Sequence, residues 1–437
     1  LASNFVKAEP NPQGLQDYIT FQFCLGDKTM FKDIYKLEPG WFMVVQYGNE
    51  ELTINTSQYW DLNYSTDTVH DEKWFSNKLL ELLENSVAIH LRSDVPLGAH
   101  LSGGLDSSTV ASLATRVLSN GKISTFTGAF SDDIIYDETR YAKSVANSIA
   151  AEYNEVYIEG NEFPDIFPKL IYYMDEPAAG PGLVPQYYVS KLASEKVKVV
   201  LGGQGGDEVF IGYARYLIVC LEKCILDSIN GSFAQVDLNL NSIRKNLTTL
   251  QSYVPMLKAF WKNGLFETGD KRYFQLIDRR EGSIDLYSDQ LFNTDYSSFQ
   301  SFCKIFNRSG ISSITDKMSY FDIKGSLPAL LQVEDRTSMA ASIESRVPLL
   351  DHRIIEFIAT VPEHIKFKNG DTKHLFKSAI KQILPKEIYE RKDKMGFPTP
   401  FEKWIRNEAR EFVSDTLLSN SARQRGIYDI QELERAI

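Results

Sequence analysis

The segment Val95-Pro-Leu-Gly-Ala-His-Leu101 runs directly into Ser102-Gly-Gly-Leu-Asp-Ser-Ser108. The first part predicts a strand, and apolar residues recur at helical spacing after the second part, from Val110 to Leu118. The first N–H groups of such a helix have no partner within the helix, so they point at whatever lies in the loop. Adjacent glycines, serine hydroxyls and the helix dipole favour an anion there. The junction therefore predicts a phosphate-binding loop.

Asp106 lies inside this loop and would repel a bare phosphate unless a divalent cation joined its carboxylate to the anion. The spacing G-x-x-x-x-G-K-[ST] of kinases and GTPases is absent, which indicates different chemistry. The letters SGGLDSS instead resemble the pyrophosphate loop of ATP pyrophosphatases, which release AMP and pyrophosphate. A plain strand-to-helix turn capped by Ser or Asp is the alternative, and the flanking strand and helix disfavour it.

The composition favours a globular protein that acts on small molecules. The chain has 437 residues, 43% of them hydrophobic, and a formal net charge of −11, which predicts two domains or one large domain with an appendage. No basic cluster suited to nucleic acid is present. No segment approaches the ~20 apolar residues of a membrane span, and no secretory signal is visible. We therefore expect a soluble, cytoplasmic protein. The four cysteines form no C-x-x-C pair, so we expect buried thiols and neither zinc nor disulfides.

The order of predicted elements indicates the fold class. Before residue 62 the pattern predicts short strands at 18–23, 41–47 and 51–55, and a helix is predicted over 72–89. Strands are then predicted at 96–101, 123–130, 154–158 and 197–201, and helices at 106–117, 138–151 and 185–194. This alternation predicts an α/β fold with a parallel sheet, helices on both faces and ligands at the carboxyl ends of the strands. After Gly212 the strand pattern stops, and a mostly helical part is expected.

A second glycine-rich segment, LGGQGGDEVFIGY at 201–213, also follows a predicted strand. Its glycines clear space beside a nucleotide, while Asp207 and Glu208 present acid groups. Because the carboxyl ends of parallel strands meet at one edge of a sheet, both loops are expected to form one cleft. Asp106 and Asp207 could then hold one Mg²⁺ together with phosphate oxygens. An acidic helix cap is the alternative.

Two further charged segments follow in the helical part. Glu334, Asp335, Arg336, Glu344 and Arg346 lie in an apolar stretch. A structural ion-pair network is the slightly favoured interpretation for these five residues, with direct substrate contact as the alternative. The loop-like run RKDKMGFP at 391–398 offers a lysine that could reach phosphate, although a solvated surface run explains it equally well.

The segments SGGLDSS, GGQGGDE, EDRTSMAASIESRVPLLDH and RKDKMGFP, in this order, resemble the asparagine synthetase family over nearly the whole chain. The resemblance implies an ATP pyrophosphatase domain of the adenine nucleotide alpha hydrolase type at 70–437, with a helical C-terminal part. Residues 1–62 resemble the final strands of an Ntn-type glutaminase (glutamine amidotransferase type-2) domain. The implied reaction adenylylates a carboxylate, with L-aspartate favoured, after which ammonia displaces AMP. ATP and Mg²⁺ would be required, and the resemblance is compatible with a homodimer.

Site residues are carried over by motif. Asp106 and Asp207 would hold Mg²⁺, and Lys394 would steady phosphate charge in the adenylylation transition state. Lys373 matches, less closely, a lysine on the substrate or phosphate side. The residues implied to contact ATP and pyrophosphate are Leu101, Ser102, Gly103, Gly104, Leu105, Asp106, Ser107, Ser108, Gly128, Gly202, Gly203 and Lys373.

The sequence departs from the family at two points. The family generally carries Glu at the position of Gln204, where it is thought to act on the acyl-adenylate and ammonia, and a neutral amide cannot be a general base. Gln204 therefore leaves a second acceptor open, such as a uronic acid in polysaccharide biosynthesis. The family's glutaminase uses an N-terminal cysteine as nucleophile, whereas this chain begins with Leu1 and Cys24 lies within a predicted strand. We therefore expect the glutaminase nucleophile to lie upstream of this chain. The chain itself would then use free ammonia and not glutamine.

Two alternatives of other classes are weaker. A nucleotide-binding regulator without catalysis would not need Asp106, Asp207 and Lys394 together. A tRNA-modifying enzyme would need a basic face, which the composition does not support.

Overall fold

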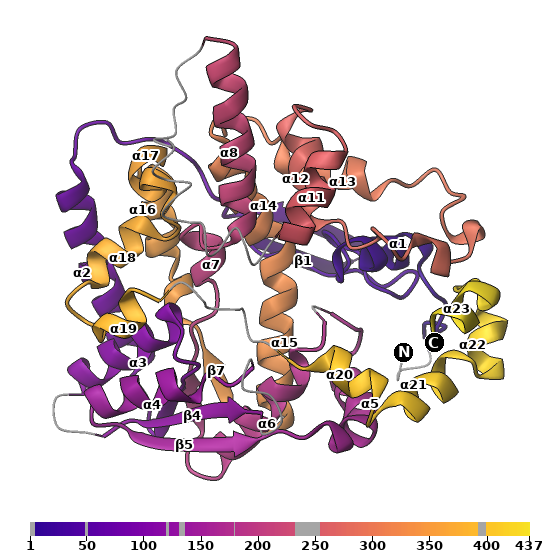
Figure 1. Cartoon of the computed structure of the whole chain (residues 1–437), viewed down its shortest axis with the longest axis horizontal. Coiled ribbons are helices and arrows are strands. Elements are labelled where there is room, and N and C mark those ends of the chain that lie inside the picture. Colours follow the sequence, from indigo (N-terminus) through magenta and orange to yellow (C-terminus); the bar gives the residue numbers. More distant parts are fainter. Residues whose placement is uncertain are drawn as a thin grey trace.

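The computed structural model describes residues 5–48, 51–118, 122–130, 136–178, 180–231, 254–391 and 399–437 (Figure 1). Its centre is a five-stranded parallel sheet with strand order β5-β4-β3-β6-β7. The strands are β3 (Leu97–His100), β4 (Ser124–Ala129), β5 (Glu152–Tyr157), β6 (Val199–Leu201) and β7 (Glu344–Arg346). The first four confirm the predicted strands, and the α/β fold class is confirmed with them.

Strand β7 contradicts the expectation that the strand pattern stops after Gly212. Its three residues, Glu344 to Arg346, pair in parallel with Val199 to Leu201 of β6. A strand this short and polar has no recognisable apolar alternation, so only its pairing with β6 reveals it. The backbone N–H of Gly202 donates to the carbonyl of Arg346 at 2.8 Å, which extends this pairing to the start of the second glycine-rich loop.

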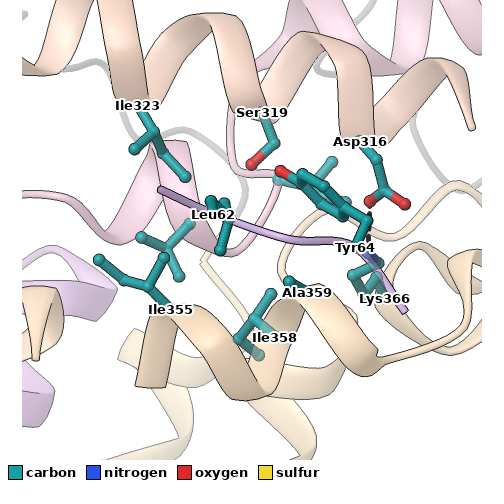
Figure 2. Close-up of a pocket in the computed structure, with 11 residues that line it drawn as sticks. Leu62, Tyr64, Asp316, Ser319, Ile323, Ile355, Ile358, Ala359 and Lys366 are labelled. Atoms are coloured by element: carbon teal, nitrogen blue, oxygen red, sulfur yellow. Dashed lines mark hydrogen bonds and ion pairs between the residues drawn. The ribbon is translucent and has the colours of Figure 1, made fainter. Parts of the chain in front are cut away.

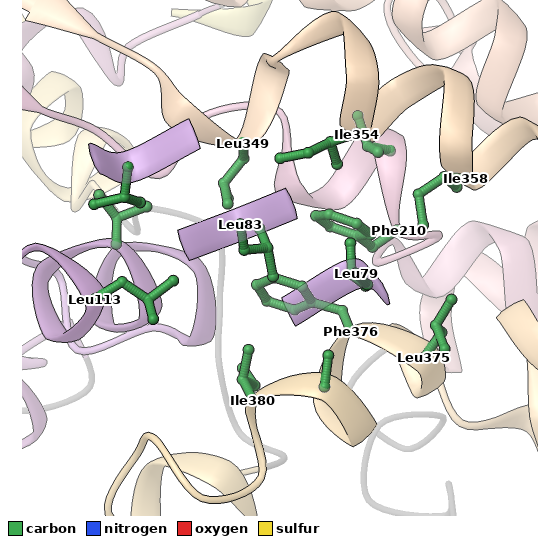
Figure 3. Close-up of a cluster of buried hydrophobic side chains, with 14 of the residues drawn as sticks. Leu79, Leu83, Leu113, Phe210, Leu349, Ile354, Ile358, Leu375, Phe376 and Ile380 are labelled. Atoms are coloured by element: carbon green, nitrogen blue, oxygen red, sulfur yellow. The ribbon is translucent and has the colours of Figure 1, made fainter. Parts of the chain in front are cut away.

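Successive side chains of a strand point to opposite faces of the sheet, and both faces carry apolar side chains. Helices pack on each face and bury these side chains in two cores. Ala99 and Leu101 enter one core, with residues of α2 (Glu72–His90) and α3 (Leu105–Val117). In this core the rings of Phe210 and Phe376 stack with centroids 4.4 Å apart (Figure 3). Phe126 and Val200 enter the other core, with residues of α6 (Leu183–Ser194). Helices α2, α3, α6 and α4 (Thr139–Ser148) confirm the predicted helices.

The remainder of the described chain is mostly helical, as predicted. Its helices are α5 (Phe163–Met174), α7 (Gly206–Val209), α8 (Ala214–Ile229), α11 (Val254–Lys262), α12 (Gly269–Ile277), α13 (Ser298–Phe306), α14 (Ile314–Phe321), α15 (Leu327–Ala340), α16 (His352–Thr360), α17 (Glu363–Lys366), α18 (His374–Ile380), α19 (Lys386–Tyr389), α20 (Phe401–Arg406), α21 (Arg410–Leu417), α22 (Asn420–Arg425) and α23 (Ile430–Ala436). A π-helical turn, Asp322–Ser326, joins α14 to α15. No helix within the described ranges has the length and apolar character to cross a membrane.

The N-terminal region differs from its prediction at residues 18–23. These residues belong largely to helix α1 (Pro12–Phe21), so the predicted strand is wrong. Asn11 caps this helix by accepting the N–H of Gln13, and Pro12 occupies the first helical position, where its missing N–H costs nothing. These capping signals outweigh the strand propensity of the aromatic residues that follow. The predicted strands at 41–47 and 51–55 are confirmed as the antiparallel pair β1 (Trp41–Gly48) and β2 (Glu51–Gln58).

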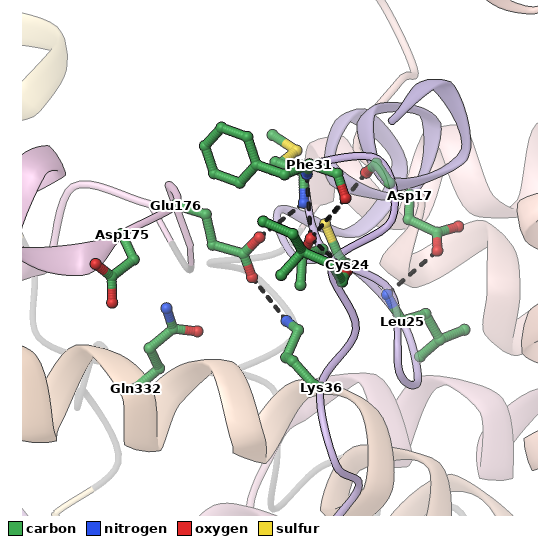
Figure 4. A network of polar contacts seen from close by, with 12 residues as sticks. Asp17, Cys24, Leu25, Phe31, Lys36, Asp175, Glu176 and Gln332 are labelled. Carbon is green, nitrogen blue, oxygen red and sulfur yellow. Dashed lines mark hydrogen bonds and ion pairs between the residues drawn. The ribbon is translucent and has the colours of Figure 1, made fainter. Parts of the chain in front are cut away.

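Polar contacts fasten the N-terminal region to the rest of the chain. The buried carboxylate of Asp17 accepts the hydroxyls of Tyr296 and Ser298 at 2.6 and 2.9 Å. Glu176 accepts the N–H of Met30 at 2.8 Å and pairs with Lys36 at 2.7 Å (Figure 4). Together these contacts hold the region against α13 and against the segment after α5.

Cys24 lies after α1 rather than in a strand, and burial raises the pKa of its thiol to about 12. Cys220 is also buried, while Cys224 and Cys303 are half-buried. All four thiols are unbridged in the structure, and the expectation of burial holds fully for two of them.

The connection between the N-terminal region and α2 is partly buried. Leu62 and Tyr64 insert between α14 and α16 and line a cavity of about 10 Å³, where Asp316 forms an ion pair with Lys366 (Figure 2). Burial raises the pKa of the Tyr64 hydroxyl well above its usual range. The connection therefore contributes to the packing of the helical part.

Candidate active site

A cavity of about 550 Å³ opens where β3, β4 and β6 end, within the usual size range for small-molecule sites. Both glycine-rich loops line it, so the prediction of a single cleft is confirmed. The residues that line it are His100, Leu101, Ser102, Asp106, Ser107, Phe126, Thr127, Gly128, Phe130, Tyr136, Glu138, Pro181, Gly182, Leu183, Gln186, Val189, Gly202, Gly203, Gln204, Gly205, Gly206, Asp207, Glu208, Tyr213, Leu330, Val333, Glu334 and Thr399.

The loop between β3 and α3 is held by its own serines. The hydroxyls of Ser102 and Ser107 lie 3.0 Å apart, and the Ser107 hydroxyl also accepts the N–H of Ser102 at 3.2 Å. The Ser102 hydroxyl accepts the N–H of Gly104 at 3.3 Å. Gly103 adopts a φ of +71°, and a Cβ on it would lie 2.6 Å from the backbone nitrogen of Ala142. Glycine is therefore required for the turn that opens α3.

The second loop packs its backbone directly against the first. A Cβ on Gly203 would lie 2.6 Å from the backbone nitrogen of Ser107. A Cβ on Gly206 would lie 2.5 Å from the carboxyl carbon of Asp106. These approaches bring Asp207, in the first turn of α7, close to Asp106, in the first turn of α3.

We predict that Gly203→Ala displaces the two glycine-rich loops relative to each other, because the clash involves the backbone of both loops. A displacement of about 1 Å at such a site costs on the order of a hundredfold in rate. The measurement is the rate of ATP–pyrophosphate exchange, with Gly48→Ala as the matched control, since a Cβ there meets nothing within 4 Å. Exchange by Gly203→Ala at the rate of the control would contradict the packing described here.

Lys373 joins the two carboxylates. Its Nζ lies 2.7 and 2.6 Å from the two oxygens of Asp106 and 2.6 Å from Oδ1 of Asp207. Lys373 is buried and takes a left-handed φ of 57° just before α18. Burial alone would lower the pKa of Lys373, but the two aspartates outweigh burial and raise it. A positive charge is thus fixed between the residues that the sequence assigned to Mg²⁺.

The donors of this site fit Mg²⁺ by type. Mg²⁺ prefers oxygen ligands and is commonly held by one or two carboxylates plus substrate phosphates. Asp106 and Asp207 both line the cavity, so their carboxylates border the space that phosphates would occupy. No cluster of three or more His, Cys, Asp or Glu side chains suited to a metal occurs among the described residues. Phosphate oxygens and water would supply the remaining ligands of a metal held by the two aspartates.

Glu208, next to Asp207, is fully buried, and burial raises the pKa of its carboxyl to about 7, with a further contribution from Asp207. The Tyr213 hydroxyl donates a hydrogen bond to it. Glu208 therefore carries less negative charge at neutral pH than an exposed glutamate would.

The structure separates the predicted contact residues into two groups. Those that line the cavity are Leu101, Ser102, Asp106, Ser107, Gly128, Gly202, Gly203, Gln204 and Asp207. Gly103, Gly104, Leu105 and Ser108 shape the turn and the start of α3 and do not line the cavity, and Lys373 reaches only the carboxylates that do.

Lys394 lies outside the described residues. On either side of the undescribed range 392–398, Arg391 and Thr399 reach the cleft. Arg391 donates to the carbonyl of Gly103 at 3.4 Å and pairs with Glu138. Thr399 lines the cavity.

The cleft residues that sequence reasoning did not assign to it include His100, Gln186 and Glu334. His100 and Gln186 carried no motif signal, because each lies within an ordinary strand or helix. Glu334 was placed with a structural ion-pair network, but α15 directs it into the cavity wall. Of its sequence neighbours, Arg336 pairs with Asp175 at 2.8 Å and Arg346 pairs with Glu344 at 2.6 Å.

The asparagine synthase family model matches residues 78–437 of this chain, which is most of its length. The chain belongs to the asparagine synthase family. The match includes both glycine-rich loops, Glu334 and Lys373.

The chain is also similar to individual proteins over most of its length. The chain is 30% identical over 410 residues to "Asparagine synthetase [glutamine-hydrolyzing] 1" of Bacillus subtilis, covering 94% of this chain and 62% of that protein. It is 23% identical to "Amidase chyE" of Penicillium rubens, covering 94% of this chain and 65% of that protein. The chain thus spans less than two thirds of the length of these relatives. An ammonia-dependent NAD synthetase of Campylobacter jejuni matches 47% of this chain and 96% of its own, with 17% identity and a TM-score of 0.21.

Proposed function

We propose that this chain is the synthetase part of an ATP-dependent amide-forming enzyme. In this reaction a carboxylate attacks the α-phosphorus of ATP and releases pyrophosphate, and ammonia then displaces AMP from the acyl-adenylate. The observation that carries the proposal is the meeting of both loops at one cavity, with Asp106 and Asp207 side by side. Membership of the asparagine synthase family supports it.

Each part of the cleft has a role in this proposal. The Ser102–Ser108 loop and the start of α3 offer N–H groups and hydroxyls to the departing pyrophosphate. Leu101, Gly128, Gly202 and Gly203 line the space assigned to adenosine.

Positive charges in the cleft are proposed to stabilise the negative charge of the phosphates. Mg²⁺, held by Asp106 and Asp207, would neutralise charge as pyrophosphate leaves. Lys373 keeps the two carboxylates together, and Lys394 is proposed to reach the phosphates from the segment between Arg391 and Thr399.

The domain assignment is also a proposal. We assign residues 70–437 to the synthetase domain and residues 1–62 to the end of a glutaminase domain. The exposed β1–β2 pair supports this, because a two-stranded ribbon with apolar residues such as Val45, Tyr47 and Ile54 exposed is marginal by itself.

The acceptor favoured is L-aspartate, and another carboxylate, such as a uronic acid, is the second candidate. The second candidate is supported by Gln204, because the family generally carries a glutamate at this position.

The first experiment supplies Mg-ATP and ammonium with each carboxylate in turn, and measures pyrophosphate and amide together. Equal amounts of pyrophosphate and asparagine would establish aspartate as acceptor. Pyrophosphate that does not rise with aspartate, from protein that still binds ATP, would favour the second candidate.

The variant Gln204→Glu separates the two acceptors further. If aspartate is the acceptor, restoring the carboxylate should raise the rate of asparagine formation. If the acceptor is a different carboxylate, Gln204→Glu should not improve the rate with aspartate. The measurement is kcat/KM for both carboxylates in the wild type and the variant.

A further inference from the structure

Lys373 reaches the two carboxylates of the cleft from a strained backbone. Ile211, in the second glycine-rich loop, and Lys373 take left-handed φ angles of 59° and 57°, and the N–H of Lys373 donates to the carbonyl of Ile211 at 3.3 Å. Residues other than glycine rarely adopt this conformation, least of all a β-branched one such as isoleucine. Strain of this kind persists where the surrounding structure enforces it, commonly at binding and catalytic sites. The backbone of Lys373 therefore indicates a role in the cleft.

Close packing fixes where the ammonium of Lys373 lies. A Cβ on Gly212 would lie 2.2 Å from Cε of Lys373 and 2.0 Å from Oδ1 of Asp207, so only glycine leaves room for both groups. On the other side, Leu375 and Phe376 of α18 are buried in the hydrophobic core (Figure 3). The second loop and the core thus hold Lys373 between them, and the fold itself places Nζ between the carboxylates.

A metal ion that joins the two carboxylates needs the space that this ammonium fills. Nζ lies 2.7 and 2.6 Å from the oxygens of Asp106 and 2.6 Å from Oδ1 of Asp207. Mg²⁺ binds such oxygens at about 2.0–2.1 Å, so it cannot bridge the two carboxylates while Nζ stays between them. Two cations this close also repel each other, and more strongly in a buried site than in water. Lys373 and a bridging Mg²⁺ are therefore alternative partners of the same two side chains.

Phosphate charge can shift this competition. A lysine ammonium is a compact charge with three donors on a flexible stem, so it can turn from carboxylate oxygens to phosphate oxygens. Mg²⁺ that arrives alone would leave the buried ammonium of Lys373 without a counter-charge, which is costly. Mg²⁺ that arrives with a triphosphate brings the anion that this ammonium needs. The metal and the new partner for Lys373 therefore come together with ATP.

We infer that Lys373 competes with Mg²⁺ for Asp106 and Asp207, so that the metal binds there only together with ATP. The inference rests on the proposed function, which assigns these two carboxylates to Mg²⁺. Lys373 is then a positioning residue with two alternative partners, first the carboxylates and then the phosphates. The competing interpretation is a static ion pair that only stabilises the fold.

The test measures metal binding directly. Mn²⁺ replaces Mg²⁺, because its electron paramagnetic resonance signal distinguishes the free ion from the protein-bound ion. The full chain is titrated with Mn²⁺ alone and with Mn²⁺ plus α,β-methylene-ATP, which cannot release pyrophosphate. The variant is Lys373→Met, which removes the charge and keeps a side chain of similar length. The matched control is Lys377→Met, since Lys377 lies in the same helix and pairs with Asp371 at 2.6 Å, away from the residues that line the cavity.

Without nucleotide, we expect Lys373→Met to bind Mn²⁺ at least about tenfold more tightly than the wild type and Lys377→Met. The reason is that a hydrogen bond between charged groups is commonly worth about a factor of ten or more, and the variant no longer has these bonds to break. Adding Asp106→Asn to Lys373→Met should abolish the binding, which would assign the ion to the same carboxylates. Mg²⁺ alone should also raise the Tm of Lys373→Met and leave that of the wild type unchanged, since a ligand stabilises the fold that binds it.

Two results would overturn the inference. Wild-type protein that binds nucleotide-free Mn²⁺ as tightly as Lys373→Met would show that the ammonium does not compete with the metal. Absence of nucleotide-free binding in Lys373→Met, while the wild type binds Mn²⁺ with the analogue, would assign Lys373 to a static ion pair.

The same comparison can be made with a second variant and separates the inference from the proposed function. If Lys373→Met does not fold, Lys373→Gln takes its place, because it is also neutral and its amide can still donate to Asp106. A wild-type protein that binds no Mn²⁺ even with the analogue would contradict the metal site of the proposed function itself, and the inference with it.

Discussion

Asp106→Asn is expected to lower the rate of ATP–pyrophosphate exchange by about 10²–10³-fold or more, the usual effect of losing a group that stabilises charge in the transition state. Asp106 is 5% exposed and holds Nζ of Lys373 with both oxygens. The amide would turn an NH₂ group toward the Lys373 ammonium or lose one of the two contacts. It would also remove one of the two carboxylates proposed to hold Mg²⁺.

The measurement is exchange at saturating ATP over a series of Mg²⁺ concentrations, since loss of a metal ligand should also raise the Mg²⁺ concentration needed for half-maximal rate. Asp415→Asn, on the exposed face of α21, is the matched control and should exchange at the wild-type rate. Exchange by Asp106→Asn at more than about a tenth of the wild-type rate would contradict the assigned role.

Arg272→Met is expected to lower the free energy of unfolding by about 3–5 kcal/mol, because it leaves a buried carboxylate without its cation. Arg272 on α12 and Glu222 on α8 are 3% and 4% exposed. Nε and Nη2 of Arg272 each donate to Glu222 at 2.6 Å. Two carbonyls, of Asn263 and Phe260, accept further hydrogen bonds from the guanidinium at 2.7 and 2.8 Å.

Urea unfolding followed by circular dichroism measures this loss. The double variant Glu222→Leu/Arg272→Met removes both charges and is expected to be more stable than Arg272→Met alone, because no charge is then left unpaired in the interior. A double variant less stable than the single one would show that the pair stabilises the helical part through its hydrogen bonds more than through charge balance.

The sequence predicted the sheet and the two loops because the residue patterns that specify them lie within short, continuous segments. Strands β3 and β6 are short apolar runs followed by glycines, and turn chemistry of this kind is readable without tertiary contacts. The same holds for the helix after Ser102–Ser108, whose apolar spacing and N-terminal serines specify it. The prediction failed where a local signal was ambiguous or too short. The aromatic residues of 18–23 favour a strand by composition, but Asn11 and Pro12 begin a helix there.

By itself the sequence therefore determined the α/β class, both glycine-rich loops and the convergence of Asp106 and Asp207, since each follows from strand ends that must share one edge of a parallel sheet. Only the tertiary structure decided that Lys373 lies between these carboxylates, that β7 completes the sheet, and that Glu334 gathers His100, Gln186 and Gln204. These residues come from elements far apart in the chain. Their contacts depend on helix packing and on the balance of buried charges, which no local pattern encodes.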